Sequence, residues 1–183
     1  KLITSFIKSY FSSATFLKIS FTLYLIDLSC LFMPELPEVE TTIRYLSLKV
    51  KEKKIIKIFK SDKRLRKNLT ITDILSINGQ KISDIKRIAK YIIIELHNNK
   101  YLVIHLGMSG RLKYLPLGHK TEKHDHLIFT FNNFLIVFND PRRFGMTFLL
   151  SNLEMLDDFF YHYGYDPLKD KIKLPVLFKL LLK

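Results

Sequence analysis

A proline and two glutamates with the potential for covalent chemistry stand at positions 34, 35 and 38 of this sequence. Met33 precedes Pro34, and removal of an initiator methionine before proline would expose the Pro34 nitrogen as a free secondary amine. A free α-amino group has a pKa near about 8, so an appreciable fraction is uncharged and nucleophilic at neutral pH. Attack on the anomeric carbon of a sugar would displace the group bound there and leave an iminium ion, with Glu35 as a proton carrier. Alternatively, Pro34 and Pro37 only shape the entry of the chain into a helix.

The residues that follow predict the helix that would carry these groups. Pro37 suits a first helical turn, where Glu38 and Glu40 complement the positive end of the helix dipole. Apolar residues then recur at the spacing of one helix face, at Val39, Ile43 and Leu46. A second helix is predicted after Ser151, with one apolar face formed by Leu153, Leu156 and Phe160, and a third apolar helix begins at 174–182.

Between the first two helices, short β-branched or aromatic runs predict strands at 91–96, 101–105, 127–131, 134–138 and 146–150. Asn98-Asn99, Asn132-Asn133 and the stretch 107–110 are typical of turns. The expected fold is α+β but mainly β. It is a two-layer β-sandwich or flattened barrel with an N-terminal helix and the start of a helical region at its C-terminal end.

The charge balance favours a polyanionic partner. Thirty Lys and Arg against 17 Asp and Glu give a net charge of +13, which suits phosphate contacts, although an anionic membrane surface would also attract it. The basic, isoleucine-containing segment 51–67 fits either a solvated strand edge or a phosphate-facing surface. One cysteine, Cys30, leaves no internal disulfide and no multi-cysteine zinc site, and it indicates a reducing compartment.

Residues 1–32 differ from the rest in being rich in Phe, Ile, Leu, Ser and Thr. Their longest uncharged stretch, 9–17, is far shorter than the roughly 20 apolar residues of a spanning helix. A secretory signal is also a poor match. We expect 1–32 to lie upstream of the true start at Met33, with a targeting or membrane-surface extension as the alternative.

Several motifs together carry a resemblance to a known family. The run Met33-Pro34-Glu35-Leu36-Pro37-Glu38-Val39-Glu40 closely resembles the N-terminus of bacterial formamidopyrimidine-DNA glycosylases. Further segments match the same family in the same order. They are Arg87-Ile88-Ala89-Lys90-Tyr91, His105-Leu106-Gly107-Met108-Ser109-Gly110-Arg111-Leu112, Lys123-His124-Asp125-His126 and Asp140-Pro141-Arg142-Arg143-Phe144-Gly145. The resemblance covers residues 33–168 and implies the family's N-terminal catalytic domain there.

The resemblance implies a role for each matching residue. Pro34 matches the nucleophile, Glu35 the general acid/base and Glu38 a supporting carboxylate. Lys90, just before a predicted strand, matches the lysine that contacts the lesion-side backbone.

A second group of matching residues is implied to enter or contact DNA: Met108, Arg142, Phe144 and His124. An enzyme that acts on a sugar–base bond must take the nucleotide out of the stack, and apolar wedges with an arginine can fill the vacated space. We expect no metal at His105, His124 or His126, because no acidic partner stands at ligand spacing; structural or phosphate-contacting roles fit them better.

The sequence departs from the family in two respects. If residues 1–33 stay attached, the Pro34 nitrogen is a tertiary amide without a free lone pair, so the chemistry requires a mature start at Pro34. The family also continues into a helix–two-turn–helix domain and a four-cysteine zinc finger. Residues 169–183 match only the start of that helical domain, and the zinc finger is absent, so we expect a fragment without a cofactor and with reduced DNA affinity.

The expected function is base-excision repair by a bifunctional glycosylase and AP lyase that removes oxidised purines such as 8-oxoguanine and formamidopyrimidines. Alternatives are an endonuclease VIII-type enzyme for oxidised pyrimidines, which Leu36 disfavours, and a non-catalytic remnant that binds DNA weakly. The expected partner is double-stranded DNA with oxidised bases or abasic sites. We expect a monomer in the bacterial cytoplasm, associated with the nucleoid and not with a membrane.

Overall fold

The computed structural model describes residues 34–164 and 166, and the predictions for 1–32, 169–183 and the helix at 174–182 lie outside that range. The described elements follow one another as α3 (Leu36–Val50), β1 (Lys57–Lys60), α4 (Ile71–Ile77), β2 (Ile82–Ile88), β3 (Tyr91–Leu96), β4 (Tyr101–His105), β5 (Arg111–Pro116), β6 (Asp125–Thr130), β7 (Phe134–Asn139), β8 (Met146–Leu150) and α5 (Leu153–Phe160).

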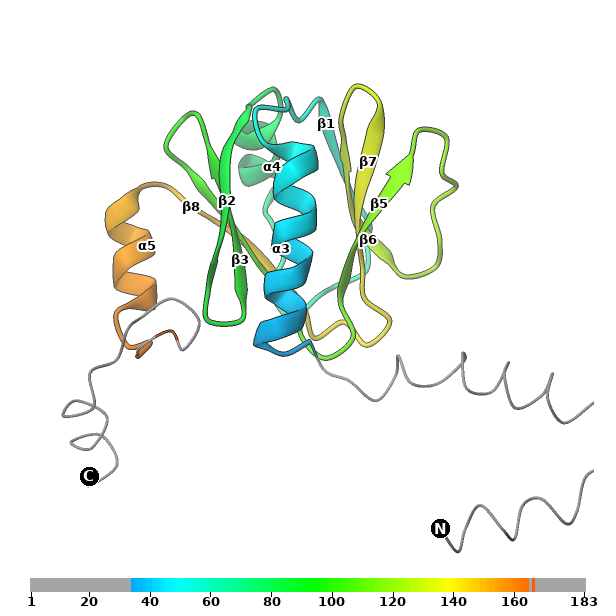
Figure 1. Cartoon of the computed structure of the whole chain (residues 1–183). Coiled ribbons are helices and arrows are strands. Elements are labelled where there is room, and N and C mark those ends of the chain that lie inside the picture. The colour runs from blue at the N-terminus through cyan, green and yellow to red at the C-terminus, as the bar shows by residue number, and fades with distance from the viewer. Residues whose placement is uncertain (1–33, 165, 167–183) are drawn as a thin grey trace, which may run out of the picture. The chain divides into compact units, whose positions relative to one another are not determined.

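Two four-stranded antiparallel sheets form the body of the domain (Figure 1). The first has the order β1-β6-β7-β5 and the second the order β2-β3-β4-β8. The expected mainly-β sandwich is therefore confirmed, as two open sheets and not a closed barrel. Helix α3 runs along the opening between the sheets (Figure 1), and its predicted apolar face is buried at Val39, Ile43 and Leu46.

The main core lies between the inner faces of the sheets and under α3. Ile92, Ile94, Leu102 and Ile104 enter it from the second sheet, and Leu127, Phe129, Ile136 and Phe138 enter it from the first. A smaller core covers the outer face of the second sheet, where Leu156 and Phe160 of α5 pack against Tyr91 and Phe148. Leu153 was predicted to share that helix face, but its side chain is 52% exposed, so the buried stripe of α5 is narrower than predicted.

The predicted strands 91–96, 101–105 and 146–150 agree with β3, β4 and β8, whereas 127–131 and 134–138 are each shifted or extended slightly. The strands β2 and β5 and the helix α4 were not predicted. β2 carries Asp84, Lys86 and Arg87, and β5 carries Arg111 and Lys113, so neither gives a continuous apolar run. In the part of the chain that the structure describes, no helix has the length and hydropathy to cross a membrane.

Candidate functional site

Two of the predicted catalytic residues, Pro34 and Glu35, directly precede the first turn of α3. Pro34 is half-buried and directly precedes Glu35, which is the N-cap of the helix. The backbone N–H of Glu35 donates to Oε2 of Glu38 at 3.1 Å, which is one half of a capping box. Glu38 thus fixes the backbone at the residue beside Pro34.

Lys90 approaches this helix start from the turn between β2 and β3. Its Nζ lies 3.2 Å from Oε1 and 3.1 Å from Oε2 of Glu35. The side chains of Lys90 and Glu35 are 45% and 53% exposed, and ion pairs so exposed contribute only about 0–1 kcal/mol. The pair is therefore easily opened.

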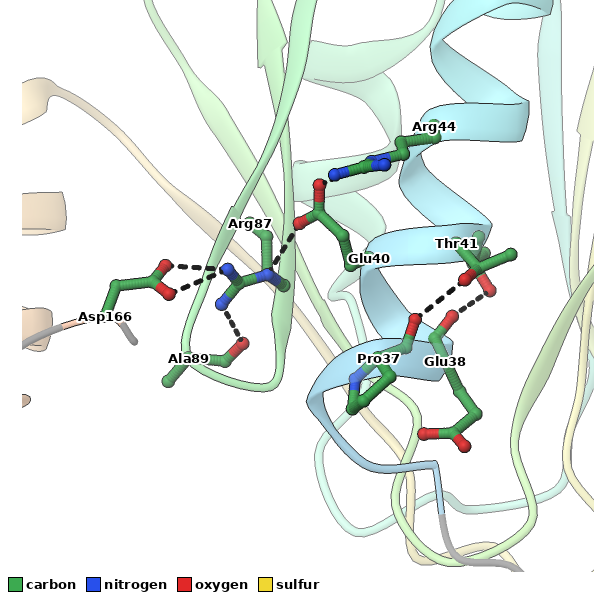
Figure 2. A network of polar contacts seen from close by, with 9 residues as sticks. Pro37, Glu38, Glu40, Thr41, Arg44, Arg87, Ala89 and Asp166 are labelled. Atoms are coloured by element: carbon green, nitrogen blue, oxygen red, sulfur yellow. Dashed lines mark hydrogen bonds and ion pairs between the residues drawn. The ribbon is translucent and has the colours of Figure 1, made fainter. Parts of the chain in front are cut away.

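A buried arginine sits behind this pair. Arg87, at the end of β2, has no exposed side-chain surface and donates from Nε to Oε2 of Glu40 at 2.8 Å. Its Nη2 donates to both carboxylate oxygens of Asp166, at 2.9 and 2.7 Å, and its Nη1 donates to the carbonyl of Ala89 at 3.0 Å. Figure 2 shows this guanidinium between the helix, the turn and Asp166.

The electrostatics of this network favour its charged form. Hydrogen bonding from Arg87, with a further contribution from Arg44, holds the pKa of Glu40 below its ordinary value. Burial works against the charge on Arg87, but its bonds to Asp166 and Glu40 raise the pKa of the guanidinium above the ordinary value. Arg87 therefore stays charged, and it ties α3 to the turn that presents Lys90.

The turn itself needs that support. Ala89 and Lys90 alone connect β2 to β3, and Ala89 has a φ of 49°, a conformation that costs a residue other than glycine on the order of 1–3 kcal/mol. The carbonyl that Arg87 holds belongs to this strained residue. The contact offsets the strain and fixes the residue immediately before Lys90.

Two loops bring the predicted DNA-inserting residues together. Met108 lies in the β4–β5 loop, and Arg142 and Phe144 lie in the β7–β8 loop. The loops touch at Gly107, where a Cβ atom would lie 2.6 Å from the backbone of Phe144 and Gly145. Gly107 also has a φ of 67°, so a side chain at this position would meet both strain and a clash.

A buried carboxylate holds these two loops as one unit. Asp140 has no exposed surface, and its Oδ1 accepts a 2.5 Å hydrogen bond from the hydroxyl of Ser109. Oδ2 of Asp140 accepts from the backbone N–H of Gly145 at 2.8 Å. The Ser109 hydroxyl in turn accepts from the backbone N–H of Arg142 at 3.1 Å. Since each loop is anchored to the same carboxylate, the tips that carry Met108 and Phe144 are positioned together.

The side chains on these loops face outward to different degrees. Met108 is half-buried, whereas Arg142 is exposed and Phe144 is 46% exposed. The Arg142 guanidinium lies 5.6 Å from the centre of the Phe144 ring, within cation–π range. His124 is half-buried beside these loops, and its carbonyl accepts from the backbone N–H of Asp140 at 3.0 Å.

The other histidines have structural contacts. Nε2 of His126 lies 2.8 Å from the Asp140 carbonyl, and Nδ1 of His105 accepts from the backbone N–H of Gly107 at 3.0 Å. Burial, with the charges of Lys90 and Arg66, lowers the pKa of His105, in keeping with an unprotonated Nδ1. Among residues 34–164 and 166, no three His, Cys, Asp or Glu side chains gather as a metal site.

Both groups of predicted residues lie at the same end of the sheets. Tyr91, the first residue of β3, pairs with His105 at the end of β4, and His105 pairs with Met146 at the start of β8. The Lys90 turn, the start of α3 and the two loops therefore share one end, at the bottom of Figure 1. The sequence alone indicated no role for Arg87, Ser109 or Asp140, although each lies within one of the motifs that carry the resemblance.

Comparisons with known proteins show which family the chain resembles. Residues 33–147 match the family model of the formamidopyrimidine-DNA glycosylase N-terminal domain. A formamidopyrimidine-DNA glycosylase of Wolbachia pipientis from Culex pipiens is 44% identical over 152 residues, which are 81% of this chain and 55% of that protein. One of Rickettsia canadensis is 44% identical over 153 residues, 79% of this chain and 54% of that protein. The chain thus spans about half the length of the curated relatives it matches.

Solved structures show the same fold. Lactococcus lactis Fpg, in a complex with DNA that contains an abasic site, is 32% identical with a TM-score of 0.65, over 70% of this chain and 48% of that one. A structure of MutM in complex with DNA that contains carbocyclic 8-oxo-G has the same identity, TM-score and coverage. On these grounds the chain belongs to the formamidopyrimidine-DNA glycosylase family, of which it carries the N-terminal domain.

Proposed function

We propose that this chain provides the catalytic domain of a bifunctional DNA glycosylase and AP lyase that removes oxidised purines in base-excision repair. The observation that carries the proposal is the meeting of Pro34, Glu35 and Lys90 at the start of α3, where Lys90 lies 3.1 Å from Glu35. Relatives bound to DNA with an abasic site or with 8-oxo-G support the substrate class. The loops with Met108 and Phe144 open on the same end of the domain.

The proposed chemistry begins at the Pro34 nitrogen, which must be a secondary amine and hence the first residue of the mature chain. Its lone pair attacks C1′ of the damaged nucleotide, the glycosidic bond breaks, the base leaves with the bonding electrons and a proton, and the Pro34 nitrogen loses its own proton. The C1′–O4′ bond then breaks as the nitrogen lone pair forms the C=N bond, and O4′ takes the bonding electrons and a proton. The resulting iminium ion acidifies the C2′ proton, so the 3′ phosphate can be eliminated, followed by the 5′ phosphate. Glu35 is the group placed to carry these protons.

Lys90 has a separate part in this proposal. An ammonium group that is 45% exposed and that, among the residues the structure describes, is held only by Glu35 can turn to a phosphate beside the lesion. Its departure frees the Glu35 carboxylate at the moment the substrate arrives. DNA binding is thereby coupled to the availability of the acid/base group.

The loop residues are proposed to hold the DNA open. Phe144 and Met108 would occupy the space that the everted nucleotide leaves, and Arg142 would hydrogen-bond the orphaned base. The contacts of Asp140 to both loops make this wedge rigid before DNA arrives. A rigid wedge loses little conformational entropy on binding.

The relatives at hand are bacterial, and we place this protein in the bacterial cytoplasm, at the nucleoid, as a monomer on double-stranded DNA. Whether oxidised purines or oxidised pyrimidines are preferred is tested with matched duplexes. A chain that starts at Pro34 is incubated with duplexes that contain 8-oxoguanine, a formamidopyrimidine or 5-hydroxycytosine, and the released bases and cut strands are quantified.

We expect the purine lesions to be released faster than the pyrimidine lesion. In Glu35→Gln the rate of base release should fall about 100-fold or more, because that is the usual contribution of a general acid–base group. Faster release of 5-hydroxycytosine would support the endonuclease VIII-type alternative. Binding without release of any base would support a non-catalytic remnant.

A further inference from the structure

Four arginines meet in an open groove beside the wedge. The groove, about 470 Å³ in volume, is lined by Arg64, Leu65, Arg66, Arg142, Arg143 and Phe144. None of the four guanidinium groups pairs with a carboxylate among the described residues. Four positive charges in one groove repel one another unless an anion binds between them. Guanidinium groups match the oxygens of a phosphate in geometry.

The groove is built on fixed backbone. Leu65 is buried in the main core and anchors its neighbours Arg64 and Arg66 in the chain. The backbone N–H of Arg66 lies 3.1 Å from the carbonyls of both Arg143 and Gly145. The groove therefore exists before any ligand binds, because its two walls are joined by main-chain hydrogen bonds.

The backbone conformation of Arg143 also indicates that the groove is preformed. Its φ is 60°, a left-handed conformation that residues with a side chain rarely adopt. Its carbonyl is engaged by Arg66, and its neighbour Gly145 is bonded to Asp140. The surrounding structure thus holds Arg143 in an unfavourable conformation with its side chain exposed on the groove.

The arginines divide into two kinds. Arg142 lies over the Phe144 ring and belongs to the wedge, whereas burial and the charges of Lys90 and Arg66 together lower the pKa of His105. Arg64 and Arg143 remain, with no contact to the candidate active site. They share the groove with the two residues proposed to meet the orphaned base.

We propose that Arg64 and Arg143 bind backbone phosphates of the undamaged strand, next to the orphaned base. The strand assignment rests on the proposed function, because it follows from Arg142 and Phe144 facing that base. The phosphates nearest to that base belong to the same strand. By holding this strand, the two arginines keep it in place while the lesion nucleotide leaves the stack.

The test measures binding without chemistry. A chain that starts at Pro34 is titrated by fluorescence anisotropy onto a duplex with a tetrahydrofuran abasic analogue, over a range of KCl concentrations. Each phosphate contact contributes about 0.9 to the slope of log K against log salt, so Arg64→Gln/Arg143→Gln should make the slope shallower by about 1.8. The matched control Lys81→Gln removes an exposed charge next to β2, at the end of the sheet away from the site, and should leave the slope unchanged.

A second arm identifies the strand. Neutral methylphosphonates replace the phosphates that flank the orphaned base, and in a separate duplex those that flank the abasic analogue. On the undamaged strand they should weaken the parent protein but leave the double variant unaffected, while on the lesion strand they should weaken both equally. The reverse pattern, an unchanged slope in the double variant, or no salt-dependent binding by the parent would overturn the proposal.

Failure here is distinct from failure of the proposed function. The abasic analogue cannot be cleaved, so an inactive Pro34 would not alter the salt slope. Conversely, a chain that releases oxidised purines but has an unchanged slope in the double variant would refute only the groove assignment.

Discussion

Of the charged side chains around the start of α3, the buried Arg87 is the one whose replacement by methionine should destabilise the domain most. Methionine is of similar length and leaves the apolar contacts of the side chain largely in place. It removes the donors to Glu40 at 2.8 Å, to Asp166 at 2.9 and 2.7 Å, and to the Ala89 carbonyl at 3.0 Å. Both carboxylates then lose a buried cation, Glu40 keeps only the exposed Arg44 among the ion pairs of the described residues, and the strained turn loses its support.

The magnitude follows from how much water can reach the orphaned groups. Removing one partner of a buried ion pair destabilises a protein by about 3–5 kcal/mol. Arg87 has no exposed side-chain surface, but Glu40 and Asp166 keep 19% and 17% of theirs, so hydration recovers part of the loss. We therefore expect a decrease of about 3 kcal/mol in the free energy of unfolding.

Urea unfolding followed by circular dichroism measures this decrease, with Arg44→Met as the matched control. Arg44 bonds the same carboxylate of Glu40 at 3.0 Å, but its side chain is 77% exposed, so its loss should cost less than about 1 kcal/mol. In Arg87→Met, the pKa of Glu40 should also rise toward its ordinary value, which an NMR titration of the carboxyl carbon reports. Equal effects of the two substitutions, or a pKa of Glu40 that does not move, would refute the assignment of Arg87 as the group that joins helix and turn.

Two further predictions concern the loops. Burial, together with the charges of Lys90 and Arg66, lowers the pKa of His105 in the folded chain, so the unfolded chain binds the proton more tightly. The stability that His105 contributes is therefore complete above its ordinary pKa of 6.5 and is lost as the pH falls through the lower pKa of the folded chain. The unfolding temperature, measured from about pH 7.5 down to about pH 5, should therefore change less with pH in His105→Asn than in the parent protein. Parallel curves of unfolding temperature against pH would contradict this. Gly107→Ala should destabilise the chain and weaken abasic-duplex binding more than Gly118→Ala, because both positions have a positive φ but only Gly107 faces backbone at 2.6 Å. Equal losses would mean that strain alone matters and that the contact between the loops does not.

The strands that could be predicted from the sequence are those with continuous apolar runs. β3 and β4 are buried at nearly every position, so their runs are unbroken. β2 was missed because Lys86 and Arg87 interrupt it, and each is neutralised by a partner that sequence spacing does not reveal. Lys86 pairs across the hairpin with Glu95 at 3.3 Å.

The candidate site was predictable only in part, for the same reason. The roles of Pro34 and Glu35 were suggested by residue type and then by the family resemblance, whereas Lys90 came from the resemblance alone, since no periodicity relates a helix start to a hairpin turn 55 residues away. Arg87 gave no signal of its own, because its partners Glu40 and Asp166 lie 47 and 79 residues away along the chain. Long-range pairs of this kind depend on the strand order, which local patterns do not encode.

Borohydride trapping on abasic-site DNA tests the central claim most directly, namely that the Pro34 nitrogen forms the Schiff base. A chain that begins at Pro34 is reduced in the presence of the DNA, and the cross-linked peptide is located by mass spectrometry. We expect a covalent adduct at Pro34, and none at that residue in a chain that retains Met33. An adduct on Lys90, or no adduct with a chain that begins at Pro34 and binds the DNA, would contradict the account.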